Sequence, residues 1–226
     1  MKIGKRLKAQ KAKVDSTKSY PTAEAIALVK DTSGVKFDAS IEVHVKLGID
    51  PKQSDQLVRA TVALPHGSGK TVKIAAFVPD DLAAEAKKAG ADTVGNKELI
   101  EEIKKSGKCD FDVAIATPDM MKDLAAIARI LGQKGLMPNP KTGTITTKVG
   151  QTVTELKAGK ISFKNDSFGN VHVVIGKVSF DAAKINDNFE AFVKALKSVK
   201  PEKLKGVYIK GIYLTSSMGP AIKVGL

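Results

Sequence analysis

The feature that most constrains the fold of this chain is an alternation of apolar and polar residues that occurs toward both ends and not in the middle. Over residues 41–49, apolar side chains alternate with charged residues and a histidine. After residue 159 the alternation returns, and it predicts a hairpin of strands at 161–163 and 171–175 joined by a turn at 165–170. A period of two is typical of strands with one buried face and one polar face. Both ends of the chain are therefore expected to supply half-exposed strands of the same type.

The middle of the chain has a different texture. Apolar runs at residues 72–78 and 113–116 predict buried strands, and they alternate with expected helices at 80–89 and 97–105 and a helix that opens at Thr117-Pro118. Buried strands that alternate with helices favour a small parallel-sheet α/β domain. We therefore expect one discontinuous domain that is interrupted by an insert. The expected boundaries are residues 1–67 and 159–226 for the discontinuous domain and residues 68–158 for the insert.

The outer parts carry further expected elements. They are a basic arm or exposed helix at residues 2–13, a helix that begins near Pro21 with Ala23, Ile26, Ala27 and Val29 on its apolar side, a strand at 58–64, a long amphipathic helix that ends at Pro201, and a last strand at 207–214.

The positive charge is concentrated in these outer parts. The chain has 37 Lys and Arg against 24 Asp and Glu, a formal net charge of +13. Residues 1–67 hold 12 basic and 7 acidic residues and residues 159–226 hold 11 and 5, whereas the middle holds 14 and 12. An excess of this size favours a polyanion as partner, with solvated surface lysines as the alternative, and it assigns the phosphate contacts to the outer domain.

Several protein classes are disfavoured by composition. No apolar run approaches the length of a membrane span, and the basic first residues lack the apolar stretch of a signal peptide, so we expect a soluble, unexported protein without a membrane partner. A single cysteine, Cys109, and three scattered histidines offer neither a disulfide nor a metal cluster, and we expect no cofactor. His44 and His172 are interpreted as isolated residues on the polar sides of their strands.

One short motif suggests a rival function, an enzyme with a nucleotide site in the insert. Residues 67–71 read Gly-Ser-Gly-Lys-Thr, which resembles the end of a phosphate-binding P-loop. The glycine that the motif needs earlier is replaced by Leu64, and a strand rather than a helix is expected to follow. A hinge is the better interpretation of these glycines.

The composition also indicates how RNA would be recognised. The chain has no tryptophan and only 5% aromatic residues, which disfavours reading single strands by base stacking. Folded RNA is recognised through phosphates and 2′-hydroxyls, for which lysines, hydroxyl side chains and exposed backbone suffice. The segment Thr215-Ser216-Ser217-Met218-Gly219 supplies such groups, although a plain strand end is the alternative interpretation.

Five blocks of sequence carry a resemblance to a known family. They read IEVHVKLGID at 41–50, ALPHG at 63–67, LGQKGLMPNPKTG at 131–143, GKISFKND at 159–166 and SMGP at 217–220. In this order, almost from end to end, they resemble the bacterial large-subunit ribosomal protein L-one family. The chain departs from that family at Ser216 and Ser217, where relatives often carry threonine, and at Gly211, where relatives can carry a polar side chain.

The resemblance implies a fold and a function. It implies an α/β protein in which an α+β split domain carries an inserted Rossmann-like, three-layer α/β domain. It also implies a structural constituent of the large ribosomal subunit in the cytoplasm, not an enzyme, that binds large-subunit ribosomal RNA at the mobile stalk near the tRNA exit site. Assistance in releasing deacylated tRNA, repression of translation from its own operon mRNA, and a monomeric state away from the ribosome are further expectations from the resemblance.

The same resemblance implies which residues contact RNA. Carried over by position, and with Thr215 added from the hydroxyl segment, the RNA-binding residues are expected to be Lys36, Phe37, Ser40, Glu42, Lys164, Asn165, Asp166, Thr215, Ser216, Ser217, Met218 and Gly219. Two lysines of the insert, Lys134 and Lys141, are expected to face tRNA.

Overall fold

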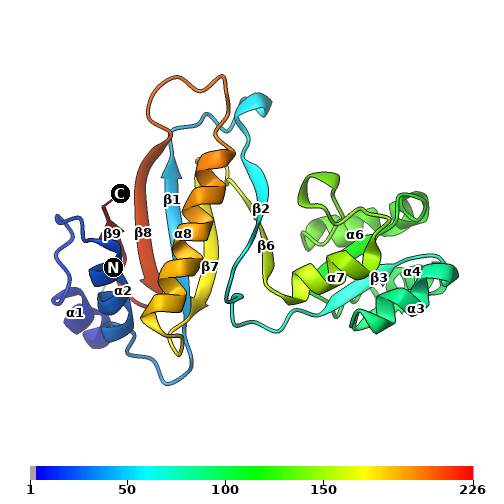
Figure 1. Cartoon of the computed structure of the whole chain (residues 1–226), viewed down its shortest axis with the longest axis horizontal. Coiled ribbons are helices and arrows are strands. Elements are labelled where there is room, and N and C mark those ends of the chain that lie inside the picture. Colours follow the sequence, from blue (N-terminus) through cyan, green and yellow to red (C-terminus); the bar gives the residue numbers. More distant parts are fainter. Residues whose placement is uncertain (1–3, 226) are drawn as a thin grey trace. The chain divides into compact units, whose positions relative to one another are not determined.

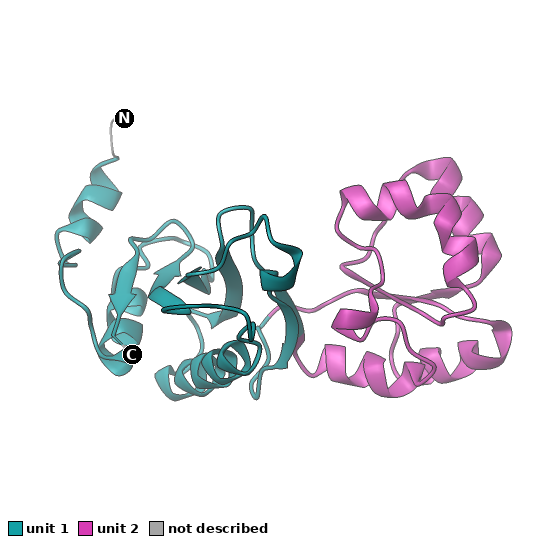
Figure 2. Cartoon of the chain, turned by 90° about the horizontal axis from the view of Figure 1, so that it is seen from above, with its two compact units in different colours: residues 1–69, 161–226 teal, residues 70–160 magenta. Residues whose placement is uncertain are grey.

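The structure, a computed structural model that describes residues 4–225, divides the chain into two compact units (Figure 2). Unit 1 consists of the residues up to Gly69 together with those from Ile161 onward, and unit 2 is Lys70–Lys160. Both crossings lie two residues beyond the expected boundaries at 67/68 and 158/159. At the first crossing the reason is that Gly69 still approaches Lys177 and Phe180 of unit 1, whereas Lys70 forms an ion pair within unit 2.

A four-stranded antiparallel sheet forms the centre of unit 1 (Figure 1). Its strands lie in the order β7–β1–β8–β9, so that the N-terminal strand β1 lies between two strands from the C-terminal part of the chain. The strands are β1 (Ser40–Leu47), β7 (Asn170–Lys177), β8 (Ile209–Ser216) and β9 (Ile222–Val224). Helices α2 (Thr22–Asp31) and α8 (Ala182–Ser198) pack against this sheet and share its apolar core.

The two faces of the sheet differ in burial. Along β1 every second residue is fully buried in the core shared with α2 and α8, while Glu42, His44 and Lys46 stay partly exposed on the opposite face. Their cross-strand neighbours on that face include His172 and Tyr213, which both lie opposite His44. We call this uncovered surface the open face.

The expected pairing of the strands at 161–163 and 171–175 is wrong. Strand β6 (Lys160–Lys164) pairs with β2 (Arg59–Ala63) rather than with β7, and the expected hairpin keeps only the isolated bridge of Asn165 with Val171 and the hydrogen bonds of its turn. Asn165 explains the difference, because its amide donates to the Val58 carbonyl at 3.0 Å and its side chain accepts from the Val58 amide at 2.8 Å. These two bonds turn the end of β6 toward β2 and leave β7 to pair with β1.

The last strand is also not the one expected. Strand β8 begins two residues later than residue 207, because Val207 lies 70% exposed in the preceding loop, and the short β9 follows it. On α2 the side chains of Ala23 and Ala27 are exposed, and the buried positions are Ala25, Ile26 and Val29. The remaining elements of unit 1 are α1 (Lys5–Lys11) and η1 (Ser54–Gln56). The start of the expected basic segment, including Lys2, lies outside the described residues.

Unit 2 is a three-stranded parallel sheet with helices on both faces. The strand order is β4–β3–β5, and separate apolar clusters lie on the two sides of β3, one around Ala75 and Phe77 and the other around Ile74 and Ala76. The elements of unit 2 are β3 (Ile74–Phe77), α3 (Asp80–Lys88), β4 (Thr93–Gly95), α4 (Lys97–Ser106), β5 (Val113–Ala116), α5 (Met121–Leu124), η2 (Ala125–Ile127), α6 (Ala128–Gln133), η3 (Pro140–Thr142) and α7 (Val149–Lys157).

The α/β fold class is therefore confirmed. The sequence pattern did not predict β4 or α7, and the helix expected after Thr117-Pro118 is divided by the 3₁₀ turn η2. Between residues 4 and 225, no helix has the length and apolar character that crossing a bilayer requires.

Candidate nucleic-acid interface

The strand register joins two of the three expected contact segments. The amide of Ser217 donates to the Ser40 carbonyl at 3.0 Å, and the Ser40 amide donates to Ser217 Oγ at 3.2 Å. Next to this pair, Glu42 lies opposite Thr215 in the β1–β8 ladder. Residues 177 positions apart in the chain are thus fixed side by side. We call the resulting surface, formed by Lys36, Phe37, Ser40, Glu42, Thr215, Ser217, Met218 and Gly219, the β1–β8 end.

The β1–β8 end exposes apolar and cationic groups together. Phe37 is 58% exposed and Met218 is 70% exposed, although both are large apolar residues, and Lys36 beside Phe37 is also exposed. Ser40 is partly engaged, because Lys177 Nζ donates to its hydroxyl at 3.0 Å. The surface can therefore offer the Lys36 cation to a phosphate. It can also offer the Phe37 ring and the Met218 thioether to a base or a sugar.

The turn after β8 holds Met218 in an unusual conformation. Met218 has φ of 62°, and it is the only residue other than glycine with positive φ among residues 4–225. The left-handed conformation costs an ordinary residue about 1–2 kcal/mol. Gly219 closes the turn so tightly that a Cβ there would collide with Ser216 Oγ, while its amide donates to the Ser216 carbonyl at 2.8 Å. This strain presents the Met218 side chain to solvent, and strain of this kind is often found at binding sites.

Ser216 differs from the other members of its segment. It is 2% exposed, and its hydroxyl has no hydrogen-bond partner among the described residues. The Ser216 side chain therefore points into unit 1, next to Gly219 in the turn after β8. Thr215 and Ser217 are partly exposed, and each hydroxyl bonds to the backbone: Thr215 Oγ1 donates to the Ser216 carbonyl at 3.0 Å, and Ser217 Oγ accepts from the Ser40 amide.

The third expected segment lies elsewhere on unit 1. Asn165 and Asp166 pack near Asn170, which lies opposite Lys46, and Lys46 is six residues along β1 from Ser40. At the rise of a strand this separation is about 20 Å. The structure therefore brings residues 36–42 and 215–219 together at one end of β1. Residues 164–166 lie near the other end of β1.

Asp166 organises the turn that precedes β7. Its carboxylate accepts hydrogen bonds from the amides of Phe168 at 2.8 Å and Asn170 at 2.7 Å, and from the Asn170 side chain at 2.9 Å. Burial alone would raise the pKa of Asp166, but the bonds from Asn170, Phe168 and His172 outweigh it and hold the pKa well below its ordinary value. Asp166 is therefore a charged, preoriented acceptor, and Lys164 beside it is exposed.

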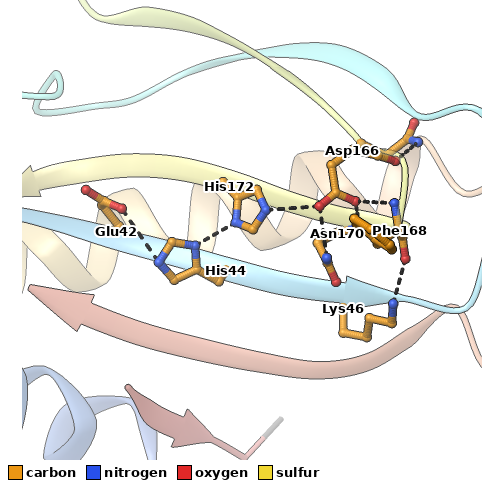
Figure 3. Close-up of polar contacts among 8 residues, drawn as sticks. Glu42, His44, Lys46, Asp166, Phe168, Asn170 and His172 are labelled. Carbon is orange, nitrogen blue, oxygen red and sulfur yellow. Dashed lines mark hydrogen bonds and ion pairs between the residues drawn. The ribbon is translucent and has the colours of Figure 1, made fainter. Parts of the chain in front are cut away.

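A chain of polar contacts crosses the open face between these two regions (Figure 3). His44 and His172 lie with their Nδ1 atoms 2.7 Å apart, and their outer nitrogens face Glu42 and Asp166. The interpretation of the two histidines as isolated residues is therefore wrong. Alternation had placed each on a polar face, but only the pairing of β1 with β7 sets them opposite each other.

The expected tRNA-facing lysines belong to unit 2. Lys134 and Lys141 are both exposed, and Lys141 is carried by the 3₁₀ turn η3. Asn139 caps that turn by accepting from the Lys141 amide at 2.8 Å. The lysines thus flank an ordered loop.

The P-loop-like motif shows no phosphate-binding geometry. Lys70 is held by Asp112, with Nζ 2.6 Å from Oδ1, and the element that follows Thr71 is strand β3 rather than a helix. Hydrogen bonds from Lys70 and from the Lys73 amide lower the pKa of Asp112. The motif therefore serves structure at the start of unit 2, as the missing glycine had indicated.

The fold and this surface together define a class of protein. It is a basic, two-unit α/β protein whose split unit presents lysine, hydroxyl and apolar groups on an open surface. Among residues 4–225 there is no group of three or more side chains that could hold a metal ion. Such a surface is suited to binding the phosphates, sugars and bases of a nucleic acid.

The chain belongs to the Ribosomal protein L1p/L10e family, whose family model matches residues 29–220. This confirms the family expected from the five sequence blocks, and it is a family of structural, non-enzymatic proteins. The chain is 50% identical over 224 residues to large ribosomal subunit protein uL1 of Thermobifida fusca, a match that covers 99% of this chain and 95% of the relative. It is 51% identical over 212 residues to the uL1 of Corynebacterium glutamicum, covering 94% and 89%. It is 49% identical over 227 residues to the uL1 of Chloroflexus aggregans, covering 100% and 96%.

Proposed function

We propose that this chain is a structural constituent of the large ribosomal subunit and that its unit 1 binds large-subunit ribosomal RNA through the β1–β8 end. The observation that carries the proposal is Met218, a large apolar residue held in a strained turn and exposed beside the Ser40–Ser217 pair. The names of the relatives, the excess of positive charge in both parts of unit 1 and the exposed Phe37 support it.

Each group at the β1–β8 end has a role in this proposal. Lys36 meets a phosphate, Phe37 and Met218 pack on a sugar or an unpaired base, and the partly exposed hydroxyl side chains exchange hydrogen bonds with ribose. Glu42 reduces affinity for any polyanion unless it accepts a bond from a base amine or a 2′-hydroxyl. Its presence therefore favours a specific folded RNA over random nucleic acid.

The more detailed roles suggested by the family are part of the same proposal. We propose that the RNA site lies on the mobile stalk near the tRNA exit site, and that Lys134 and Lys141 of unit 2 face the exit-site tRNA and assist release of deacylated tRNA. An operon mRNA that folds like the ribosomal site would compete for the same β1–β8 end, which gives repression of the protein's own translation. Away from the ribosome the chain acts as a monomer.

Substitutions in the turn after β8 test the site. Ser217→Ala removes the hydroxyl that accepts from Ser40 and Met218→Ala removes the exposed thioether, and each is expected to weaken binding of a stalk fragment of large-subunit ribosomal RNA by about 1–3 kcal/mol. Met218→Gly should weaken binding as much while leaving the melting temperature equal or higher, because glycine adopts positive φ without strain. Affinities are measured by gel-shift titration against a scrambled RNA of the same length.

The control for these substitutions is Lys122→Gln on the exposed surface of unit 2, which should leave the affinity unchanged. Unchanged affinity in both Met218 variants would show that the RNA site lies elsewhere.

A further inference from the structure

The contact between His44 and His172 is unusual because both partners are ionisable rings. Their Nδ1 atoms lie 2.7 Å apart and the ring centroids are separated by 5.0 Å in an edge-to-face arrangement. Each outer nitrogen faces a carboxylate: His44 Nε2 is 3.6 Å from Glu42 Oε2, and His172 Nε2 is 3.4 Å from Asp166 Oδ2 (Figure 3). Four groups from β1, β7 and the turn before β7 thus form one line across the open face.

Counting protons along this line identifies its charge. The line has three gaps, Glu42 to His44, His44 to His172, and His172 to Asp166, and each gap is attractive only if it holds a proton. Two neutral imidazoles carry two protons, so one gap would join a lone pair to a lone pair or to a carboxylate. Two imidazolium rings carry four protons, so two N–H groups would oppose each other at 2.7 Å. Three protons, and hence one positive charge on the pair, satisfy every gap.

The surrounding charges agree with a single positive charge. Lys46 on β1 donates to the Phe168 carbonyl at 2.6 Å, and Lys223 on β9 lies opposite Tyr213, which separates it from His44. Neither lysine therefore takes the place of a histidine N–H beside Glu42 or Asp166. Burial lowers the pKa of His44, and the charge of His172 lowers it further against the opposing effect of Glu42, which disfavours a second charge on the pair.

We infer that His44 and His172 act as a proton-sharing pair that holds one positive charge at neutral pH and thereby fixes the orientation of Glu42 and Asp166 on the open face. The inference concerns the free chain and goes beyond the proposed function. The two histidines are positioning residues, because they act on RNA through the carboxylates that they hold.

The test is the proton count of the imidazole rings in the full chain, measured by long-range ¹H–¹⁵N NMR. At pH 7 both Nε2 atoms of His44 and His172 should be protonated and a third proton should be shared between the two Nδ1 atoms, and the signals of both rings should show the same two titration steps, as expected of coupled sites. In His44→Gln, His172 should titrate in a single step. An unprotonated Nε2 on either ring at pH 7, or separate single steps in the unsubstituted chain, would overturn the inference.

The third histidine provides a matched control. His66 Nε2 lies 2.9 Å from Asp187 Oδ2 and has a carboxylate but no second ring, so its signals should be the same in every variant. An unchanged His66 signal also shows that a variant is folded. If His44→Gln does not fold, His172→Gln and the tautomers of the unsubstituted chain decide the question.

The consequence for RNA rests on the proposed function and is measured separately. Loss of the shared proton removes the positive charge of the pair and leaves one of the three gaps without a proton, so affinity for the ribosomal RNA fragment should fall as pH rises from 7 to 9, by about fivefold more than in the His44→Gln, His172→Gln double variant. Equal pH dependence in both proteins, with the NMR result as expected, would overturn only this link to RNA.

Discussion

At the residue scale, the described part of unit 1 keeps two buried hydroxyl groups, those of Ser216 and Tyr208, that gain no hydrogen bond. Ser216 Oγ lies beneath the turn that presents Met218, and the Tyr208 hydroxyl is buried in the segment that leads into β8. A buried hydroxyl without a partner costs about 1–3 kcal/mol. The buried hydroxyl of Ser216 lies directly beneath the candidate RNA interface. Tyr208 is outside that interface, so its hydroxyl is expected to contribute nothing to binding.

Removing the Tyr208 hydroxyl should therefore stabilise the chain. Tyr208→Phe is expected to raise the free energy of unfolding by up to about 1 kcal/mol, because it deletes a desolvated group while keeping the ring. The matched control is Tyr20→Phe, which removes the acceptor of the Asp15 amide at 3.0 Å and should lower stability by about 0.5–1.5 kcal/mol. Urea unfolding measures both, and a destabilised Tyr208→Phe would mean that this hydroxyl has a partner.

The same substitution should change the response to alkaline pH. Burial raises the pKa of Tyr208 to about 12, above the ordinary value of about 10 in the unfolded chain. Since the unfolded chain releases this proton first, the contribution of Tyr208 to stability is intact below pH 10 and declines as pH rises toward 12. The stability difference between Tyr208→Phe and the unsubstituted chain should therefore widen over that interval.

At the scale of elements, a buried asparagine on α8 anchors the segment that leaves unit 1. Asn188 is fully buried, and its amide donates to the carbonyls of Ile175 at 2.7 Å and Gly67 at 2.9 Å while its oxygen accepts from the His66 amide at 3.1 Å. One side chain thus ties α8, β7 and the end of the Pro65–Gly67 turn together. The chain is fixed immediately before it enters unit 2.

Replacing Asn188 should be severe. Asn188→Ala leaves the buried Ile175 carbonyl and two part-buried backbone groups, the His66 amide and the Gly67 carbonyl, without this partner, and it is expected to lower the free energy of unfolding of unit 1 by about 2–4 kcal/mol. Asn186→Ala, two residues away on the same helix, removes only an exposed bond to Glu190 and should change stability by less than about 0.5 kcal/mol. Equal effects of the two substitutions in denaturant unfolding would contradict the anchoring role.

The elements also show what the sequence can and cannot predict. The amphipathic character of α8 and the buried odd-numbered residues of β1 follow from local periodicity, and the sequence predicted them. The pairing of β6 with β2 depends on two hydrogen bonds between Asn165 and Val58, which are 107 residues apart. The contact of His44 with His172 and the role of Asn188 likewise depend on long-range register. Periodicity reports which face of an element is buried, but not which element lies opposite.

At the scale of the whole molecule, the two units divide both core and charge. Each unit encloses its own apolar clusters, and most of the excess positive charge belongs to the segments of unit 1. Because binding to RNA phosphates releases counterions, this division predicts which substitutions alter the salt dependence of binding. Expectations about the β1–β8 end came from the family resemblance, while its strained turn and its pairing with Ser40 are visible only in three dimensions.

Single lysine substitutions test this division. Lys36→Gln should lower the slope of log affinity against log salt for the ribosomal RNA fragment by about 1, because one phosphate contact is lost. Lys141→Gln in unit 2 removes the same charge and should leave the slope for this RNA unchanged. A slope that depends on Lys141 and not on Lys36 would show that our proposal places this RNA on the wrong unit.

The most direct test of the central claim is amide hydrogen exchange of the full chain with and without the ribosomal RNA fragment. If the β1–β8 end binds the RNA, exchange should slow in residues 35–42 and in residues 215–221 together, and it should stay unchanged across unit 2. Slowing confined to residues 70–160, with both segments of unit 1 unaffected, would contradict the account.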